Sequence, residues 1–320
     1  METMTCSSCK KKYPRHDGIP DFRVFPDPYL DFEEDRKRTE IVLAGLKRHN
    51  LESLLKYYWS FSDITPEFLR RNFIRSALLG EQRAQRIVRL LENGTFNEPV
   101  VAASVLEIGC GTGNFLTVAV QHYKQVIGID IAMRWLHASR RRFMDSHLPV
   151  SPLVCCCAEY LPFPDGMFDL IVTSSTLEFA RDPSKVLSEC ARVLKANGSL
   201  LLNTVNRFSL ARDPYAYLWG VGFLPRAWQA RYVQWWRNAS YENIRLLSFR
   251  KLNKMAAKYF AIREFVPTDI DDQALSQFSR FVRLQVHIYR RLKRLPLFAF
   301  LLKWVGPGWD AKLGKGSMTS

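Results

Sequence analysis

The sequence predicts an α/β fold built on a mostly parallel, doubly wound sheet, and three segments support this prediction. An apolar run from Val105 to Leu116 stops at a cluster of glycines and resumes with helical periodicity, which indicates a strand, a tight turn and a helix. A second short apolar strand is expected over residues 125–131, and a helix capped by Asp182 leads into a further strand. Strands and helices in alternation favour a parallel sheet with helices on both faces.

The glycine turn is the part of this pattern that suits a ligand. Gly109, Gly111 and Gly113 can adopt backbone angles closed to other residues, so main-chain N–H groups and a helix N-terminus can approach a bound molecule. A nicotinamide-binding turn would continue with glycine where this chain has Asn114. Glu107 would repel a pyrophosphate and would instead suit a ligand that carries an ammonium group.

The string E-x-G-x-G-x-G over residues 107–113 closely resembles the first motif of the class I S-adenosylmethionine (SAM) dependent methyltransferases. The stretch AEYLPFPDGMFDLIVTSS from Ala158 is similar to the adenine-side loop and fourth strand of that family, and the resemblance spans roughly residues 104–206. It implies a methyltransferase type 11-like core with a Rossmann-like sheet, a helical insertion, a helical C-terminal extension and SAM as cosubstrate.

The resemblance also implies which residues bind the cosubstrate. Asp130, at the end of the second strand, would accept both ribose hydroxyls. Similar sequences usually carry aspartate at the position of Cys157 to bind the adenine amino group, and Glu159 is expected to replace it. The complete set of expected cofactor-binding residues is Glu107, Gly109, Cys110, Gly111, Gly113, Asp130, Ile131, Ala158, Glu159 and Ser174.

Catalysis by this core would depend mainly on alignment. Methyl transfer from a sulfonium is an in-line displacement that loses charge, so positioning and exclusion of water could supply most of the rate. An acidic acceptor would also benefit from a base, and the candidate carboxylates are Glu178, Asp182 and Asp213, none of them a firm assignment. Many relatives have a histidine where this chain has Phe179, so that base is absent.

The chain carries a formal net charge of +15, and the excess is concentrated after the core: residues 207–320 hold 20 Lys and Arg against 7 Asp and Glu. Such a block indicates an anionic partner, which could be nucleic acid, acidic lipid headgroups or a phosphorylated substrate. The seven cysteines, three of them consecutive at 155–157, are interpreted as reduced. No secretion signal or spanning segment is evident, so we expect a cytoplasmic protein that could lie on the cytoplasmic face of a membrane.

We expect residues 1–64 to form a remnant of a zinc knuckle and a connector. Cys6-Ser-Ser-Cys9 and the segment after it resemble the second knuckle of small zinc-ribbon proteins associated with methyltransferases. Tetrahedral zinc needs four ligands, and Cys6, Cys9 and at most His16 are too few. The sequence therefore predicts no metal site unless further ligands exist.

The remaining boundaries follow from composition. Residues 65–206 are the expected SAM-binding core, opened by one long helix over 65–91, and 207–247 form an aromatic and basic insertion for the acceptor. Residues 248–270 complete the core with a sixth strand, and no seventh is recognised. The last domain, 271–320, is a basic amphipathic extension.

Two interpretations of that extension stay open. A helix over about 273–294 has Arg280, Arg283, His287, Arg290 or Arg291 and Arg294 at helical spacing, and the apolar segment LPLFAFLLKWV follows it. Such a basic stripe beside an apolar wedge resembles a membrane-surface element. The alternative is that the apolar segment folds back onto the core.

The leading functional hypothesis is transfer of a methyl group to oxygen or carbon of a small acceptor that is lipid-linked, quinone-like or a glycan. A tRNA or rRNA methyltransferase is the second hypothesis, favoured by charge but disfavoured because no RNA-binding module is recognisable. A SAM-binding scaffold without turnover is the third, because a fold does not establish activity.

Overall fold

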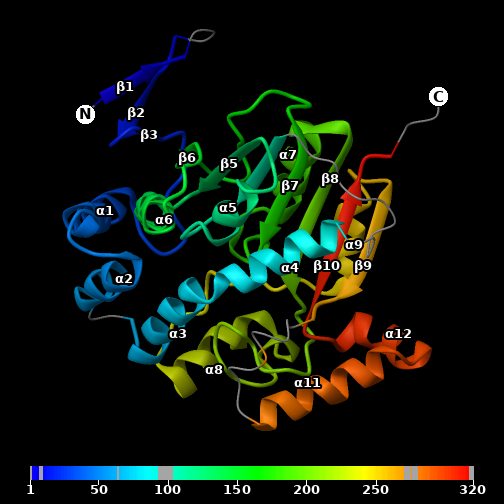
Figure 1. Cartoon of the computed structure of the whole chain (residues 1–320). Coiled ribbons are helices and arrows are strands. Elements are labelled where there is room, and N and C mark those ends of the chain that lie inside the picture. Colours follow the sequence, from blue (N-terminus) through cyan, green and yellow to red (C-terminus); the bar gives the residue numbers. More distant parts are fainter. Residues whose placement is uncertain are drawn as a thin grey trace.

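The computed structural model describes residues 2–6, 10–62, 65–92, 104–269, 275 and 280–316. Its centre is a seven-stranded sheet with the order β6-β5-β4-β7-β8-β10-β9 (Figure 1). The strands are Ser104–Ile108 (β4), Gln125–Asp130 (β5), Leu153–Cys155 (β6), Phe168–Ser174 (β7), Leu194–Val205 (β8), Ile262–Pro267 (β9) and Gly308–Gly314 (β10). The five strands from β6 to β8 are parallel, and β10 is antiparallel to both of its neighbours. The predicted α/β, Rossmann-like sheet is confirmed.

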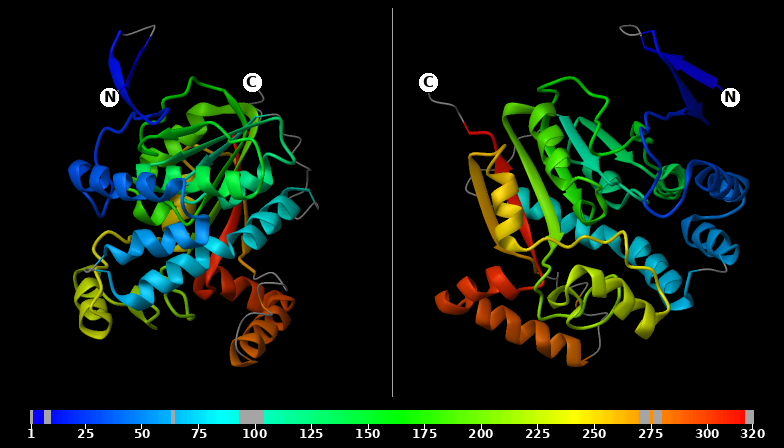
Figure 2. Two further views of the ribbon diagram at one scale, coloured as in Figure 1. Left: turned by 60° about the vertical axis from the view of Figure 1, so that its left-hand side comes forward. Right: turned by 180° about the vertical axis from the view of Figure 1, so that it is seen from behind.

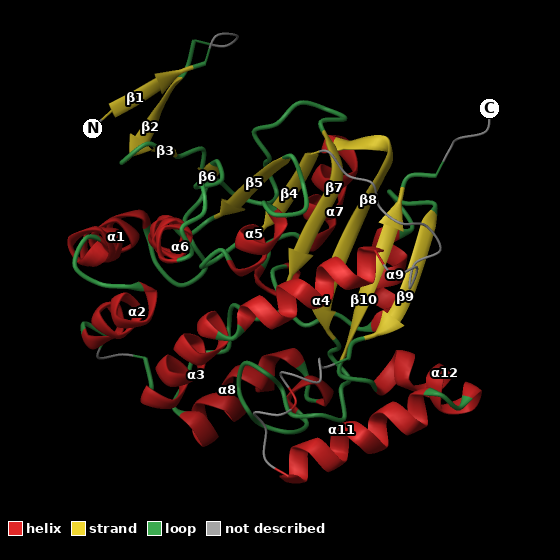
Figure 3. Ribbon diagram, viewed as in Figure 1, coloured by secondary structure: helices red, strands yellow, loops and turns green. Residues whose placement is uncertain are grey.

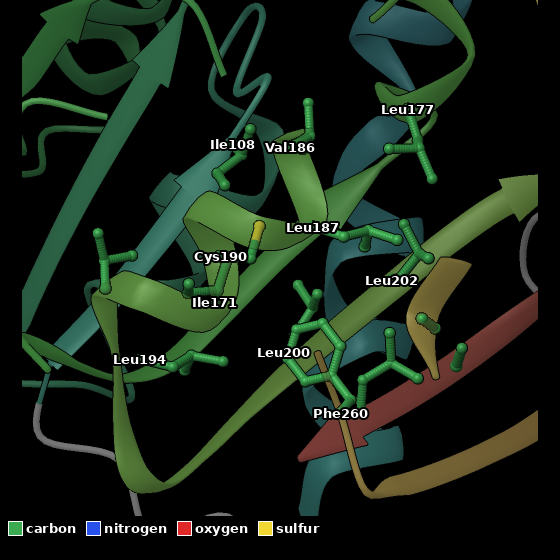
Figure 4. Close-up of a cluster of buried hydrophobic side chains, with 14 of the residues drawn as sticks. Ile108, Ile171, Leu177, Val186, Leu187, Cys190, Leu194, Leu200, Leu202 and Phe260 are labelled. Atoms are coloured by element: carbon green, nitrogen blue, oxygen red, sulfur yellow. The ribbon is translucent and has the colours of Figure 1, made fainter. Parts of the chain in front are cut away.

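Helices cover both faces of this sheet (Figure 3). The helices concerned are α4 (Gly80–Glu92), α5 (Asn114–Ala119) and α6 (Met133–Asp145) on one face, and α7 (Pro183–Val193) and α9 (Phe249–Ala256) on the other. In β8, Leu200 and Leu202 pack toward α7 while Leu201 packs on the opposite side, because strand side chains alternate. Figure 4 shows Leu187 of α7 beside that first pair. The sheet is therefore doubly wound.

The N-terminal part contains two helices that start as their sequences indicate. α1 (Phe32–Leu46) begins after Asp31, whose carboxylate accepts the N–H of Glu34 at 2.8 Å. α2 (Leu51–Ser60) begins after Asn50, whose side chain accepts the N–H of Ser53 at 2.9 Å. Each cap satisfies one N–H that has no partner inside the helix.

The long helix expected over residues 65–91 is two helices, α3 (Glu67–Leu78) and α4. Leu79 interrupts the helix with a ψ near 0°. At Gly80 a Cβ would lie 2.3 Å from the Asn114 side chain, so the start of α4 packs directly against the glycine turn. The prediction was wrong on continuity because apolar periodicity runs through a bend of this kind unchanged.

β10 corrects the prediction for the C-terminal extension. Residues 308–314 lie between β8 and β9 and are buried throughout. This part of the predicted domain 271–320 therefore belongs to the core sheet and not to a separate extension. Asp310 in this strand pairs with Arg86 of α4 at 2.6 Å and accepts a hydrogen bond from Asn203 at 2.7 Å. A buried charge is tolerated in a central strand because both of these partners satisfy it.

The chain begins with a small separate sheet of β1 (Glu2–Thr5), β2 (Lys12–His16) and β3 (Ile19–Pro20). Cys6 follows β1, whereas Cys9 lies outside the described residues, so the knuckle prediction stays a prediction. The described parts of the chain contain no group of three metal-ligating side chains. Residues 21–31, which we call the N-terminal strap, then run along β6, where Phe22 N–H donates to Cys155 O at 2.8 Å.

The insertion after β8 forms a small helical unit with its own apolar cluster. It contains the 3-10 turn η2 (Val221–Phe223) and α8 (Arg226–Arg237), and its buried residues include Val233 and Tyr241. Among the described residues between β9 and β10 are the helices α11 (Arg280–Lys293) and α12 (Pro296–Val305). In the described part of the chain, none of the helices is long and apolar enough to cross a bilayer.

Candidate cosubstrate site

The glycine turn between β4 and α5 has all three glycines at positive φ: +73° at Gly109, +51° at Gly111 and +77° at Gly113. A Cβ at Gly109 would lie 2.1 Å from the Thr176 hydroxyl, and one at Gly113 would lie 2.1 Å from the Ser139 hydroxyl. At Gly111 a Cβ would meet nothing within 4 Å. The outer glycines thus allow close packing, and Gly111 faces open space.

Asp130, the last residue of β5, fixes that turn. One carboxylate oxygen accepts the N–H of Gly111 at 2.9 Å, and the other accepts the N–H of Ala132 at 2.8 Å. Burial raises its pKa to about 6, an effect that these two backbone hydrogen bonds oppose. The carboxylate therefore lies beside the turn, where the resemblance places the ribose hydroxyls, and each of its oxygens retains a lone pair for a further donor.

Glu107 is the unusual residue of the site. Its side chain is 6% exposed, and its Oε2 atom has no hydrogen-bond partner. Burial, and secondarily the nearby Asp130 carboxylate, raise the pKa of Glu107 well above its ordinary value. A buried carboxylate oxygen without a partner costs free energy, which a cationic donor from a ligand would offset.

A cleft of about 250 Å³, lined by Glu107, Gly109 and Gly111, lies between the glycine turn and the helices α3 and α4. Phe73 and Trp135 stack at 4.6 Å between ring centroids to form an aromatic wall. The residues that line the cleft include Phe73, Ala77, Gly80, Arg83, Ile87, Glu107, Gly109, Cys110, Gly111, Thr112, Phe115, Trp135 and Ser174. Five of the ten predicted cofactor residues therefore share one cavity.

Arg142 of α6 connects the helix α3 to the glycine turn. Its Nε donates to the carbonyl of Thr112 at 2.7 Å, and its Nη2 donates to the carbonyl of Ala77 at 2.6 Å. One buried side chain thus ties the end of α3 to the glycine turn. Burial lowers the pKa of Arg142 to about 10, so the guanidinium still carries its charge at neutral pH.

The residues of the predicted adenine side make contacts that the sequence did not indicate. One oxygen of Glu159 accepts the N–H of Arg181 at 2.8 Å, which directs this carboxylate to the connection before α7. This oxygen of Glu159 therefore binds the backbone there, and the expected adenine role of the residue stays a prediction. Cys157 bonds instead to the N-terminal strap, accepting from Val24 N–H at 3.4 Å and donating to Phe25 O at 3.5 Å.

Three other predicted cofactor residues make contacts within the protein. The carbonyl of Ile131 accepts Arg23 Nη1 at 3.1 Å, and Ala158 packs against the cluster shown in part in Figure 4. Gly113 packs beneath the turn on Ser139. No contact with the cleft was found for these three residues, so their assignment to SAM stays a prediction.

The N-terminal strap is anchored by buried ion pairs that the sequence did not indicate. Arg134 of α6 pairs with Asp27 at 2.8 Å and with Asp35, and Arg23 pairs with that same Asp35 at 2.5 Å. Asp27 lies near enough to Asp130 to contribute to its raised pKa. The strap therefore lies across the β6 side of the site.

The three candidate bases occupy different environments. Asp182 is the N-cap of α7 and accepts from Ser184 N–H at 2.9 Å, while Asp213 accepts the Tyr241 hydroxyl at 2.5 Å and two backbone N–H groups. Both carboxylates are occupied by structural contacts. Glu178, in the 3-10 turn η1 (Leu177–Phe179), accepts from Thr204 and Val205 through Oε1, and its Oε2 is buried without a partner.

Several residues of the site were missed in the sequence. The prediction for Phe73, Ala77 and Arg83 was only that they belong to the helix over 65–91, and Trp135 was not singled out. The signal that could have found the first three is the aromatic and small residues that follow Thr65-Pro66, because those residues precede the glycine motif and would cover its open side.

Comparison with known proteins agrees with this geometry. Residues 106–202 match the family model described as a methyltransferase domain. A ubiquinone biosynthesis O-methyltransferase of Xanthomonas oryzae is 30% identical over 152 residues, which cover 44% of this chain and 63% of that protein. The biotin biosynthesis bifunctional protein BioHC of Saccharophagus degradans is 31% identical over 176 residues, which cover 55% of this chain and 29% of that protein. The chain thus spans less than two thirds of the length of these relatives.

Among solved structures, a SAM-dependent methyltransferase of Thermotoga maritima superposes with a TM-score of 0.45 at 21% identity, over 78% of this chain and 97% of that protein. The segment 106–202 thus matches a methyltransferase domain, for which the expected cosubstrate is SAM. The cleft suits this molecule: Glu107 offers an unpartnered carboxylate oxygen, and Gly111 leaves room above the turn.

Proposed function

We propose that this chain is a SAM-dependent methyltransferase that methylates an oxygen of a small acceptor. The observation that carries the proposal is the buried Oε2 atom of Glu107, which has no protein partner and lines the cleft beside the glycine turn. SAM supplies a methyl group on a sulfonium when it is bound. Oxygen as the acceptor atom is supported by the relatives named as O-methyltransferases.

Several residues of this chain would bind and orient the cosubstrate. Glu107 would accept the ammonium group, and Asp130 would accept the ribose hydroxyls while it holds Gly111 N–H at 2.9 Å. Phe73 and Trp135 would exclude water, which strengthens the electrostatic contacts inside the cleft.

Glu178 is the remaining candidate to accept a proton from the acceptor hydroxyl. Burial raises its pKa, and its Oε2 atom is uncommitted, whereas Asp182 and Asp213 are used in structural contacts. Positioning alone can provide much of the rate of methyl transfer. We therefore expect Glu178→Gln to lower the rate with an acidic phenol less than with a weakly acidic alcohol.

The aromatic insertion supports an acceptor with a large apolar part. Trp219, Trp228, Trp235 and Trp236 are all more than half exposed. A quinone-like ring, a lipid tail or a lipid-linked glycan would each match such a surface. The broad chemical class is thus an amphiphilic molecule with a hydroxyl to be methylated.

The test is transfer of a labelled methyl group from SAM to a panel of catechols, prenylated phenols and lipid-linked sugars, with Gly111→Arg as the blank. Label on a phenolic or sugar oxygen is the expected result. Label only on added RNA would replace the proposal by the RNA methyltransferase hypothesis. Tight SAM binding without transfer to any acceptor would favour the scaffold hypothesis.

A further inference from the structure

The helix α12 is apolar, yet it is not buried in the protein. It consists of PLFAFLLKWV, yet none of its residues is buried. Leu297, Phe300, Leu301 and Trp304 follow one another at helical spacing and are 68%, 58%, 44% and 42% exposed. Soluble proteins rarely leave a continuous apolar helix face uncovered, so this face indicates an apolar partner.

The neighbouring helix α11 presents cations on its outer side. Its inner side is fixed to the protein, because Tyr289 donates to Thr268 O at 2.8 Å, and Arg290 and Lys293 both pair with Asp269. The predicted basic stripe therefore continues through Arg291 rather than Arg290. The outer members of the stripe, which lie about one helical turn apart along one side, are Arg280, Arg283, His287, Arg291 and Arg294.

The outer cations of α11 have no acidic partner in the described part of the chain. Among the described residues no carboxylate pairs with Arg280, Arg283, Arg291 or Arg294. Leu284 and Ile288 lie on the same side of the helix and are 57% and 49% exposed. The outer side of α11 thus combines unpaired positive charge with exposed apolar groups, the composition of a helix that lies in a bilayer interface.

The aromatic helix α8 occupies the same end of the molecule as α11 and α12 in every view (Figures 1 and 2). Its Trp228, Trp235 and Trp236 are 62%, 83% and 61% exposed. Tryptophan is favoured at the boundary between lipid and water because its ring is apolar and its N–H is polar. The arrowheads of β7 and β8 point toward this end in Figure 1, so it is the end at which parallel strands place their ligands.

We propose that α8, α11 and α12 form one docking surface for an anionic lipid bilayer. The outer arginines of α11 would bind acidic headgroups, and the apolar face of α12 would insert beneath them. The protein would lie on the membrane without crossing it, since none of its described helices could span one. The opening of the cosubstrate cleft would then be close to acceptors dissolved in the bilayer.

Stable docking requires both the electrostatic attraction of the α11 arginines to acidic headgroups and the burial of the apolar α12 side chains. Acidic headgroups attract each basic residue near the surface with about 1 kcal/mol, which corresponds to about a fivefold change in partition coefficient. Salt weakens this attraction because it screens exposed charges. Burial of the α12 side chains adds an apolar contribution that salt does not screen.

Flotation of the full-length protein with vesicles tests the proposal. We expect binding to vesicles that contain phosphatidylglycerol, little binding to phosphatidylcholine alone, and release in high salt. The variant Arg280→Gln/Arg291→Gln/Arg294→Gln should bind about a hundredfold more weakly. Lys47→Gln/Arg48→Gln/Lys124→Gln removes the same charge from exposed positions elsewhere and should bind at nearly the wild-type level.

The apolar contribution is tested with Leu297→Ser/Phe300→Ser/Leu301→Ser. These side chains are exposed, so the variant should fold, retain SAM affinity and lose vesicle binding. Wild-type protein that ignores anionic vesicles would overturn the proposal. So would a serine variant that binds vesicles normally. Selective binding of RNA by the wild type, lost in the arginine variant, would assign this surface to nucleic acid instead.

Discussion

The cosubstrate cleft and the α8–α11–α12 surface depart in opposite directions from the rule that proteins bury apolar groups and expose charges. In the cleft, the Glu107 carboxylate is only 6% exposed and one of its oxygens has no partner. On the surface, Trp235 is 83% exposed and α12 has no buried residue. Each departure costs free energy in the free protein, and a matching ligand would offset that cost. The chemistry of each departure supports the proposed ligand: a cation for the cleft and a lipid interface for the surface.

Gly111→Arg should separate the two regions most completely. Its side chain would enter the open space above the glycine turn, so we expect SAM binding to become unmeasurable by calorimetry while vesicle binding is unchanged. Gly166→Arg is the matched control, since Gly166 also has positive φ, +64°, and open space but lies away from the cleft. Both substitutions strain the backbone by about 1–2 kcal/mol. Equal SAM affinity in the two variants would contradict the assignment of the cleft.

Arg134→Leu should show that the buried ion pairs of the N-terminal strap stabilise the fold. Loss of this arginine leaves the buried Asp27 without its cation, and we expect a fall of about 3 kcal/mol in the free energy of unfolding. Arg140→Leu, on the same helix, removes a more exposed pair with Asp17 and should cost less than about 1 kcal/mol. Denaturant titrations measure both values. Similar losses in the two variants would mean that the strap network adds little stability.

A pH titration of SAM affinity should sharpen the contrast between buried and exposed charges. The pKa of Asp130 is raised to about 6, so its carboxylate takes up a proton as the pH falls through that value. We expect the affinity to fall by about tenfold for each pH unit below 6. Protonation of Glu107, whose pKa is also raised, should lower the SAM affinity in the same direction. The pH dependence that remains in Asp130→Asn measures the contribution of Glu107. An affinity that stays constant from pH 7 to pH 5 would show that neither carboxylate is needed in its ionised form.

The parts of the fold that depend on local signals could be predicted from the sequence. The glycine turn, the strand that ends at Asp130 and the cap formed by Asp182 all consist of neighbouring residues. β10 was missed because Asp310 and Lys312 make it look like a polar tail. The residues that make Asp310 acceptable, Arg86 and Asn203, are more than 100 positions away in the chain.

The candidate site, too, could be predicted only where neighbouring residues in the sequence form it. Five of the expected cofactor residues line the cleft, since a sequence motif determines the shape of its own turn. The wall made by Phe73 and Trp135 and the contact of Cys157 with the strap required tertiary packing. The contact of Glu159 with Arg181 N–H could not be predicted either, because the two residues are distant in the sequence.

The most direct test of the central claim is a double-mutant cycle between Glu107 and the ligand ammonium group. Calorimetry would compare S-adenosylhomocysteine with its deaminated analogue on the wild type and on Glu107→Gln. If the buried carboxylate holds the ammonium, the two changes should be coupled by about 1.5–3 kcal/mol. Losses that simply add, with no coupling, would contradict the claim that Glu107 recognises the cosubstrate.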